Sequence, residues 1–129
     1  MANVFIALTM SGETLPLSDD GLLRGGNNLF LFNTTLNAAA NVDTITDFSV
    51  AADLIGLDHA IFSALGAGNL AASAFTVGAA ATTAAQHIIY NAATGALYYD
   101  PDGLGGAAQT QFATLTTGLA LTHNSFAVV

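Results

Sequence analysis

Cysteine and lysine are both missing from this chain, and Arg24 is its only residue with a permanent positive charge. Without cysteine the chain can form neither disulfides nor thiolate metal sites, which fits a protein exported without an oxidative folding step. Nine acidic residues give a net charge of −8. Because almost nothing could neutralise phosphate, the composition argues against nucleic-acid binding and against attachment to anionic membrane surfaces.

Charge of either sign is scarce. Charged residues make up 8% of the chain, against about 25% in typical soluble domains. No apolar run reaches the roughly 18 residues that a membrane-spanning helix needs, so no membrane span is expected. The N-terminus lacks the basic region of a secretory signal peptide, so export would need another signal. The 129 residues suffice for one domain with a real core.

The segment from Asn41 to Asp58 predicts two short strands joined as a hairpin. Its first half alternates between two faces, as a half-buried strand does. Residues 49–53 provide the turn, and residues 54–58 form the second strand. Four of the nine acids fall in this segment, with no basic residue nearby in sequence, namely Asp43, Asp47, Asp53 and Asp58.

Clustered carboxylates without counter-charges destabilise a fold unless water or a cation surrounds them. Hard oxygen ligands suit calcium. A second acidic loop, Asp100-Pro101-Asp102-Gly103, resembles the start of an Asp-x-Asp-Gly calcium loop, although no glutamate closes it as in an EF-hand. The predicted metal ligands are therefore Asp43, Asp47, Asp53, Asp100 and Asp102. The alternative is that these acids are solvated turn residues, and Asp58 could cap a helix instead of binding metal.

The remaining patterns predict strands at residues 3–10, 13–18 and 111–115, a hairpin of 87–90 with 96–99, and an apolar end of the chain at 121–129. A short helix is expected at 58–66 and one helical turn near 72–75. Together these elements predict an all-β fold: a single β-sandwich or β-roll-like domain with one or two short helices. Residues 1–20 are assigned to an N-terminal strand arm and residues 21–129 to the β domain.

Several motifs in order carry a family resemblance. They are Asp-Thr-Ile-Thr-Asp-Phe (43–48), Asp-Leu-Ile-Gly-Leu-Asp (53–58), the run from His87 to Gly103 and the terminal Phe126-Ala127-Val128-Val129. This order resembles the C-terminal region of RTX calcium-binding proteins of the haemolysin and serralysin type, over roughly residues 21–129. The resemblance implies bound calcium and export through a type I secretion system with an uncleaved C-terminal signal.

The chain also departs from that family. Only a remnant of one glycine-rich repeat is present, around Gly25-Gly26. The alternative interpretation of this segment is an ordinary Gly-Asn turn between two strands. Residues that are usually charged are replaced by Ala51, Ala52 and Leu54. Loss of surface charge favours association between copies. The alternative is a low-charge secreted domain with a normal core.

Catalysis finds little support, because no His-Glu-x-x-His, Gly-x-Ser-x-Gly or phosphate-loop motif occurs, and His59, His87 and His123 are isolated. The leading hypothesis is an extracellular, calcium-binding structural protein that assembles with itself into a filament, matrix or surface layer. The first alternative is a monomeric calcium-binding cap that serves folding or export of a partner. The second is an enzyme.

The N-terminal arm is the predicted assembly element. Residues 3–10 are apolar on both faces, and the sequence offers no clear hairpin partner for them. An apolar strand with a free edge can add to the sheet of a neighbouring copy. The alternative is that this strand completes its own sheet.

Overall fold

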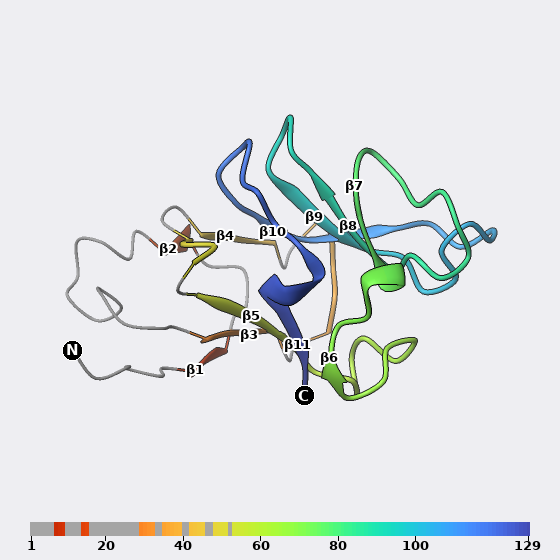
Figure 1. Cartoon of the computed structure of the whole chain (residues 1–129), viewed down its shortest axis with the longest axis horizontal. Helices are drawn as coiled ribbons and strands as arrows, with labels where there is room; N and C mark the ends of the chain where they lie inside the picture. The colour runs from red at the N-terminus through yellow and green to blue at the C-terminus, as the bar shows by residue number, and fades with distance from the viewer. Residues whose placement is uncertain are drawn as a thin grey trace.

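The computed structural model describes residues 7–9, 14–15, 29–32, 35–39, 42–45, 48–51 and 53–129. The Gly25-Gly26 remnant and Asp47 lie outside these ranges. In the described part, strands form two sheets that lie one above the other in Figure 1. Helix among the described residues is restricted to two short 3-10 turns, η1 (Ala72–Ala74) and η2 (His123–Ser125). The predicted all-β fold is confirmed.

The first sheet has the strand order β1-β3-β5-β11-β6, with bounds Ala7–Thr9, Leu29–Phe32, Leu54–Leu57, Phe126–Val128 and Gly68–Asn69. The second sheet has the order β2-β4-β10-β9-β8-β7, with bounds Thr14–Leu15, Asp43–Ile45, Thr110–Thr114, Ala96–Tyr99, Ile88–Asn91 and Phe75–Val77. The two sheets face each other across the core.

The chain changes sheet at every step from β1 to β5. Strands β1, β3 and β5 lie side by side and parallel in the first sheet, and β2 and β4 do so in the second. Parallel neighbours need a long crossover connection, which in most proteins is a helix. Here the crossover is a strand in the opposite sheet, so the first half of the chain winds as a parallel roll (Figure 1).

The predicted hairpin at residues 41–58 is wrong. Both strands exist, as β4 and β5, but they belong to different sheets. Strand β4 pairs with β2 and β10, and β5 pairs with β3 and β11. Alternation of side chains locates a strand but does not identify its neighbour. The turn between them therefore crosses from sheet to sheet, closed by hydrogen bonds between Ser49 and Asp53.

The second predicted hairpin is confirmed. Strands β8 and β9 pair antiparallel, with Ile88 opposite Tyr99 and Asn91 opposite Ala96. Gly95 in the connecting loop has φ 81°, a left-handed conformation that glycine adopts without strain. A Cβ at this position would lie 2.0 Å from the Leu115 carbonyl oxygen. Glycine is therefore required here both by conformation and by space.

The predicted helix at 58–66 is wrong, and the segment forms irregular turns. The expected cap is present, because Asp58 Oδ1 accepts a hydrogen bond from Ala60 N at 2.9 Å. Only the first turn follows, with Phe62 N donating to Asp58 O at 2.8 Å. So short a segment gains little from helix formation. Burial of Phe62, which is fully inaccessible to solvent, accounts for its conformation instead. The helical turn expected near 72–75 is confirmed as η1.

The N-terminal arm has a partner in its own chain. Strand β1 pairs parallel with β3, with Ala7 opposite Leu29, and β2 pairs parallel with β4. The prediction that this strand lacks an intramolecular partner is wrong for residues 7–9, and the alternative that it completes its own sheet is confirmed there. Strand β1 is an edge strand of the first sheet and β2 is an edge strand of the second sheet. The N-terminal strands therefore occupy one edge of each sheet.

Aromatic side chains join the two sheets through the core. Phe112 of β10 contacts Phe32 of β3 and Phe62, with both ring centroids 5.1 Å away and both pairs edge to face. Phe62 contacts Tyr99 of β9 in the same way at 5.0 Å. Edge-to-face pairs stabilise a core beyond the area they bury. This cluster holds the irregular segment 58–66 between the sheets.

Candidate functional site

The acidic loop between β9 and β10, residues 100–109, is the candidate site. It lies at the far right of Figure 1, beside the loop that follows β7. Asp100 ends the ladder of the β8–β9 hairpin, where its N–H donates to His87 O at 2.8 Å. Asp100 is buried, with 6% of its surface exposed, whereas Asp102 is exposed. A rigid hairpin therefore presents one buried and one exposed carboxylate.

Hydrogen bonds from the backbone fix both carboxylates. Asp100 Oδ1 accepts from Asp102 N at 3.3 Å, and Asp102 Oδ2 accepts from Ala107 N at 3.0 Å. Burial and the neighbouring Asp102 carboxyl raise the pKa of Asp100 above its ordinary value. The Ala107 N–H lowers the pKa of Asp102. The fold thus holds two carboxyl groups close together and makes ionisation of the buried Asp100 unfavourable. A bound cation would stabilise the ionised form of Asp100.

Carbonyl oxygens approach the same loop from the β7–β8 connection. A Cβ placed on Gly103, which has φ 62°, would lie 2.6 Å from both the Thr83 and the Ala84 oxygen. The connection itself is held by Gln86, whose Oε1 accepts from Thr82 N at 2.7 Å. Gln109 Nε2 donates to Ala79 O at 3.1 Å and ties the two loops together. Two backbone carbonyls therefore lie against Gly103, the residue that follows Asp102 in the acidic loop.

The His87 side chain makes a hydrogen bond to the backbone of the acidic loop. Its Nδ1 lies 2.7 Å from Asp100 O, and because a carbonyl only accepts, Nδ1 carries the proton. His59 and His123 make the same kind of bond, to Val129 O at 2.7 Å and to Leu70 O at 2.9 Å. No local pattern predicts these contacts, because the partners are 13, 70 and 53 residues away along the chain.

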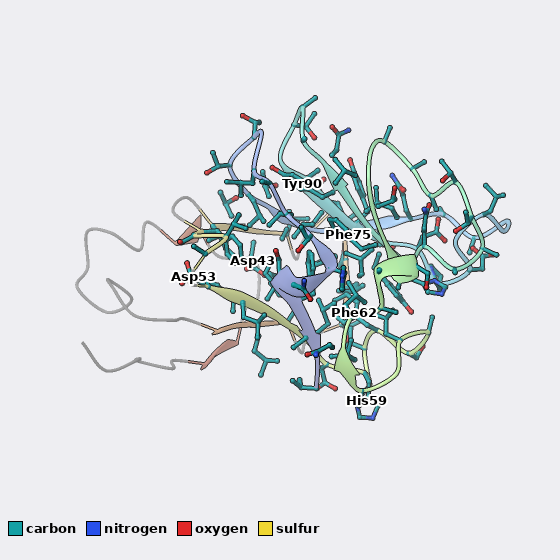
Figure 2. The ribbon with its side chains drawn as sticks, viewed as in Figure 1. Asp43, Asp53, His59, Phe62, Phe75 and Tyr90 are labelled. Atoms are coloured by element: carbon teal, nitrogen blue, oxygen red, sulfur yellow. The ribbon has the colours of Figure 1, made fainter. Side chains whose placement is uncertain are left out.

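The other predicted ligands lie elsewhere. Asp43 in β4 and Asp53 before β5 are both buried, with 1% and 9% of their surface exposed. Asp43 begins β4 and Asp53 directly precedes β5, and both are well separated from His59 in Figure 2. Asp53 Oδ2 accepts from Ser49 N at 2.8 Å and closes that turn. Asp47, the remaining predicted ligand, lies outside the described residues. Asp58 serves as a cap.

The predicted ligands thus fall into two regions, Asp43 with Asp53 and Asp100 with Asp102. Within the described ranges, no three His, Asp or Glu side chains gather closely enough to hold a metal ion by themselves. A cation at either region would need backbone carbonyls or water to complete its coordination, as calcium accepts. The Asp100–Asp102 loop already has carbonyls beside it.

An open cavity of about 280 Å³ lies near the same end of the domain. Its lining is mostly small and apolar, with Asn69 and His87 as the polar side chains. No helix in the described part of the chain is long and apolar enough to cross a membrane.

Comparisons with models of protein families, with curated proteins and with solved structures find no match for this chain. Function must therefore be inferred from the residues and their geometry.

Proposed function

We propose that this chain is a calcium-binding structural module of the RTX type, exported by a type I secretion system and assembling with itself outside the cell. The observation that carries the proposal is the parallel roll of β1 to β5, in which successive strands alternate between two sheets. Calcium-binding proteins with nonapeptide repeats form parallel β-helices, in which successive strands likewise alternate between sheets. The roll therefore adds physical support to a resemblance that began with sequence motifs.

Calcium is proposed to bind at the loop of Asp100 and Asp102. The two carboxylates supply charge, and the Thr83 and Ala84 carbonyls beside Gly103 supply neutral oxygen ligands. Water would complete the six to eight ligands that calcium prefers. A cation offsets the unfavourable ionisation of a buried carboxyl, but Asp43, Asp53 and Asp100 are all buried. The carbonyls beside Gly103 are therefore the reason for choosing this loop first. Asp43 and Asp53 form the second candidate region.

Thermal unfolding with calcium and with chelator tests this proposal. A ligand at 100 times its dissociation constant stabilises the folded state by about 2.7 kcal/mol. Wild type should therefore melt higher in calcium, and Asp102→Asn should lose most of that increase. Asp58→Asn is the matched control, because Asp58 caps a turn elsewhere. If Asp43→Asn abolishes the response and Asp102→Asn keeps it, the site lies at the β4–β5 crossover instead.

Self-assembly is proposed to proceed through the first edge of the roll. Strand β1 has no neighbour on its outer side among the described strands. Edge strands commonly carry lysine or proline that discourages pairing between molecules. Strand β1 reads Ala7-Leu8-Thr9, and the chain has no lysine at all. Light scattering at rising protein concentration should therefore show association. Leu8→Lys should reduce this association. Val77→Lys, in the edge strand β7 of the second sheet, is the control and should not reduce it. A monomer at every concentration would favour the calcium-binding cap.

Export is proposed to depend on the terminal Phe126–Val129 segment. In the folded chain this segment is β11, which lies between β5 and β6 with Phe126 and Val128 buried. Its deletion would remove an interior strand, so loss of export by the truncated chain would not separate signal from fold. Transfer of residues 110–129 to an unstructured passenger avoids this problem. Export of the passenger by a type I system supports the proposal, and retention of the passenger in the cell refutes it.

A further inference from the structure

The carbonyl group that joins Asp100 to Pro101 receives two hydrogen bonds. His87 Nδ1–H donates to its oxygen at 2.7 Å, and Gly103 N–H points at the same oxygen from 3.4 Å. Two N–H donors that converge on one carbonyl stabilise negative charge on its oxygen, as in the oxyanion holes of acyl-transfer enzymes. The nitrogen of the amide that they polarise belongs to Pro101, and the side-chain carboxyl carbon of Asp100 is three bonds from the carbonyl carbon.

We propose that the Asp100–Pro101 peptide bond is a site of self-hydrolysis, a single-turnover reaction of this chain on itself. An Asp100 carboxyl oxygen attacks the Asp100 carbonyl carbon and closes a five-membered ring, and the carboxyl proton passes to solvent. The bond to Pro101 nitrogen then breaks, its electron pair stays on nitrogen, and solvent supplies a proton there. The cyclic anhydride that remains is opened by one water molecule. The products are an Asp100 with a free α-carboxylate and a Pro101 with a free secondary amine, and no oxidant or reductant is needed.

The hydrogen-bond donors are held in place before any reaction. The backbone of His87 is anchored on both sides, since His87 N donates to Ala74 O at 3.0 Å and His87 O accepts from Asp100 N at 2.8 Å. Gly103 packs closely against the Thr83 and Ala84 carbonyls, which leave no space for a Cβ. The donors thus require little rearrangement as charge develops on the carbonyl oxygen, which is the condition under which such groups accelerate a reaction.

Cleavage here leaves the fold connected. Residues 100–109 form the loop between β9 and β10, which remain paired with Gln111 opposite Tyr98 and Thr114 opposite Ala96. The larger product, residues 1–100, retains β1 to β9, and the smaller product, residues 101–129, retains β10 and β11. Strand β11 stays paired with β5 and β6 of the larger product. The expected product is therefore a folded, nicked protein of two chains.

The test incubates the full chain in mildly acidic buffer with chelator, separates the products in denaturant and measures their masses. The proposal expects fragments 1–100 and 101–129, whose masses sum to the intact chain plus one water. It also expects the folded chain to react about tenfold or more faster than the same chain in urea, because folding orients the groups. Since calcium is absent throughout, this result does not depend on whether the proposed calcium site exists.

Four variants assign the roles. His87→Phe should slow cleavage by about tenfold to a hundredfold in the folded state, as loss of an oxyanion donor does, and leave the rate in urea unchanged. His123→Phe is the matched control, because His123 makes the same bond to a different carbonyl, that of Leu70. Pro101→Ala, at an exposed position, should abolish the reaction. Asp100→Ala should abolish it too. A native rate no faster than that in urea, or an unchanged rate in folded His87→Phe, overturns the proposal.

Discussion

Replacing Phe62 by alanine should destabilise the protein more than the irregular conformation of its segment suggests. Phe62 is fully buried, and its ring packs edge to face against Tyr99 and Phe112 at 5.0 and 5.1 Å. Truncation of a buried phenylalanine to alanine costs about 3–5 kcal/mol. Because Phe62 joins the turn segment to strands β9 and β10, the expected loss lies near the middle of that range, about 4 kcal/mol.

This loss translates into a large change in melting temperature. An unfolding entropy of about 2.1 cal/mol/K per residue gives about 0.27 kcal/mol/K for 129 residues. A loss of about 4 kcal/mol therefore lowers Tm by roughly 15 °C. Urea denaturation followed by circular dichroism measures the free energy directly. Leu104→Ala, at a side chain with 63% of its surface exposed, is the control and should change stability by less than about 0.5 kcal/mol. A loss below about 1.5 kcal/mol for Phe62→Ala would refute the proposed role of the aromatic cluster.

Three further predictions concern single groups. Gly95→Ala should lower Tm sharply in a thermal melt, because its Cβ would lie 2.0 Å from the Leu115 oxygen. An unchanged Tm would contradict this close approach of the β8–β9 loop to Leu115. Tyr90→Phe should cost about 1–3 kcal/mol in urea denaturation, because the buried hydroxyl donates to Thr116 O at 2.5 Å and accepts from Leu119 N at 3.1 Å; no loss would contradict that bridge. In chelator, stability should fall as pH rises above the ordinary Asp pKa of 3.8, since a raised pKa means that the folded state holds its proton more tightly. Asp100→Asn should remove this fall, and an identical pH profile of unfolding free energy in both proteins would show that Asp100 is not its cause.

The sequence predicted strands better than it predicted their neighbours. The hairpin of β8 and β9 followed from local signals, a short loop that ends in glycine between two apolar runs. Strands β4 and β5 also followed from alternation, but their assignment to one hairpin failed. In a roll the partner of a strand is two strands away along the chain, and alternation does not encode that separation.

The candidate site shows the same division. Asp100 and Asp102 stood out in the sequence because acids beside Pro and Gly mark a turn. Nothing local indicated that Thr83 and Ala84 would direct carbonyls at Gly103, or that His87 would hold the Asp100 carbonyl. These contacts involve backbone atoms and depend on two loops that meet only after the strands have paired. The helix predicted at 58–66 failed for a related reason, because tertiary burial of Phe62 outweighs a weak local preference.

Calorimetric titration with calcium measures whether the Asp100–Asp102 loop binds this ion. Wild type and the double variant Asp100→Asn/Asp102→Asn would be compared in the same buffer, with Asp58→Asn as a control for loss of one carboxylate. We predict saturable heat for wild type and for Asp58→Asn, and none for the double variant. Equal binding by the double variant, or no heat in wild type at millimolar calcium, the range of weak extracellular sites, would contradict the claim.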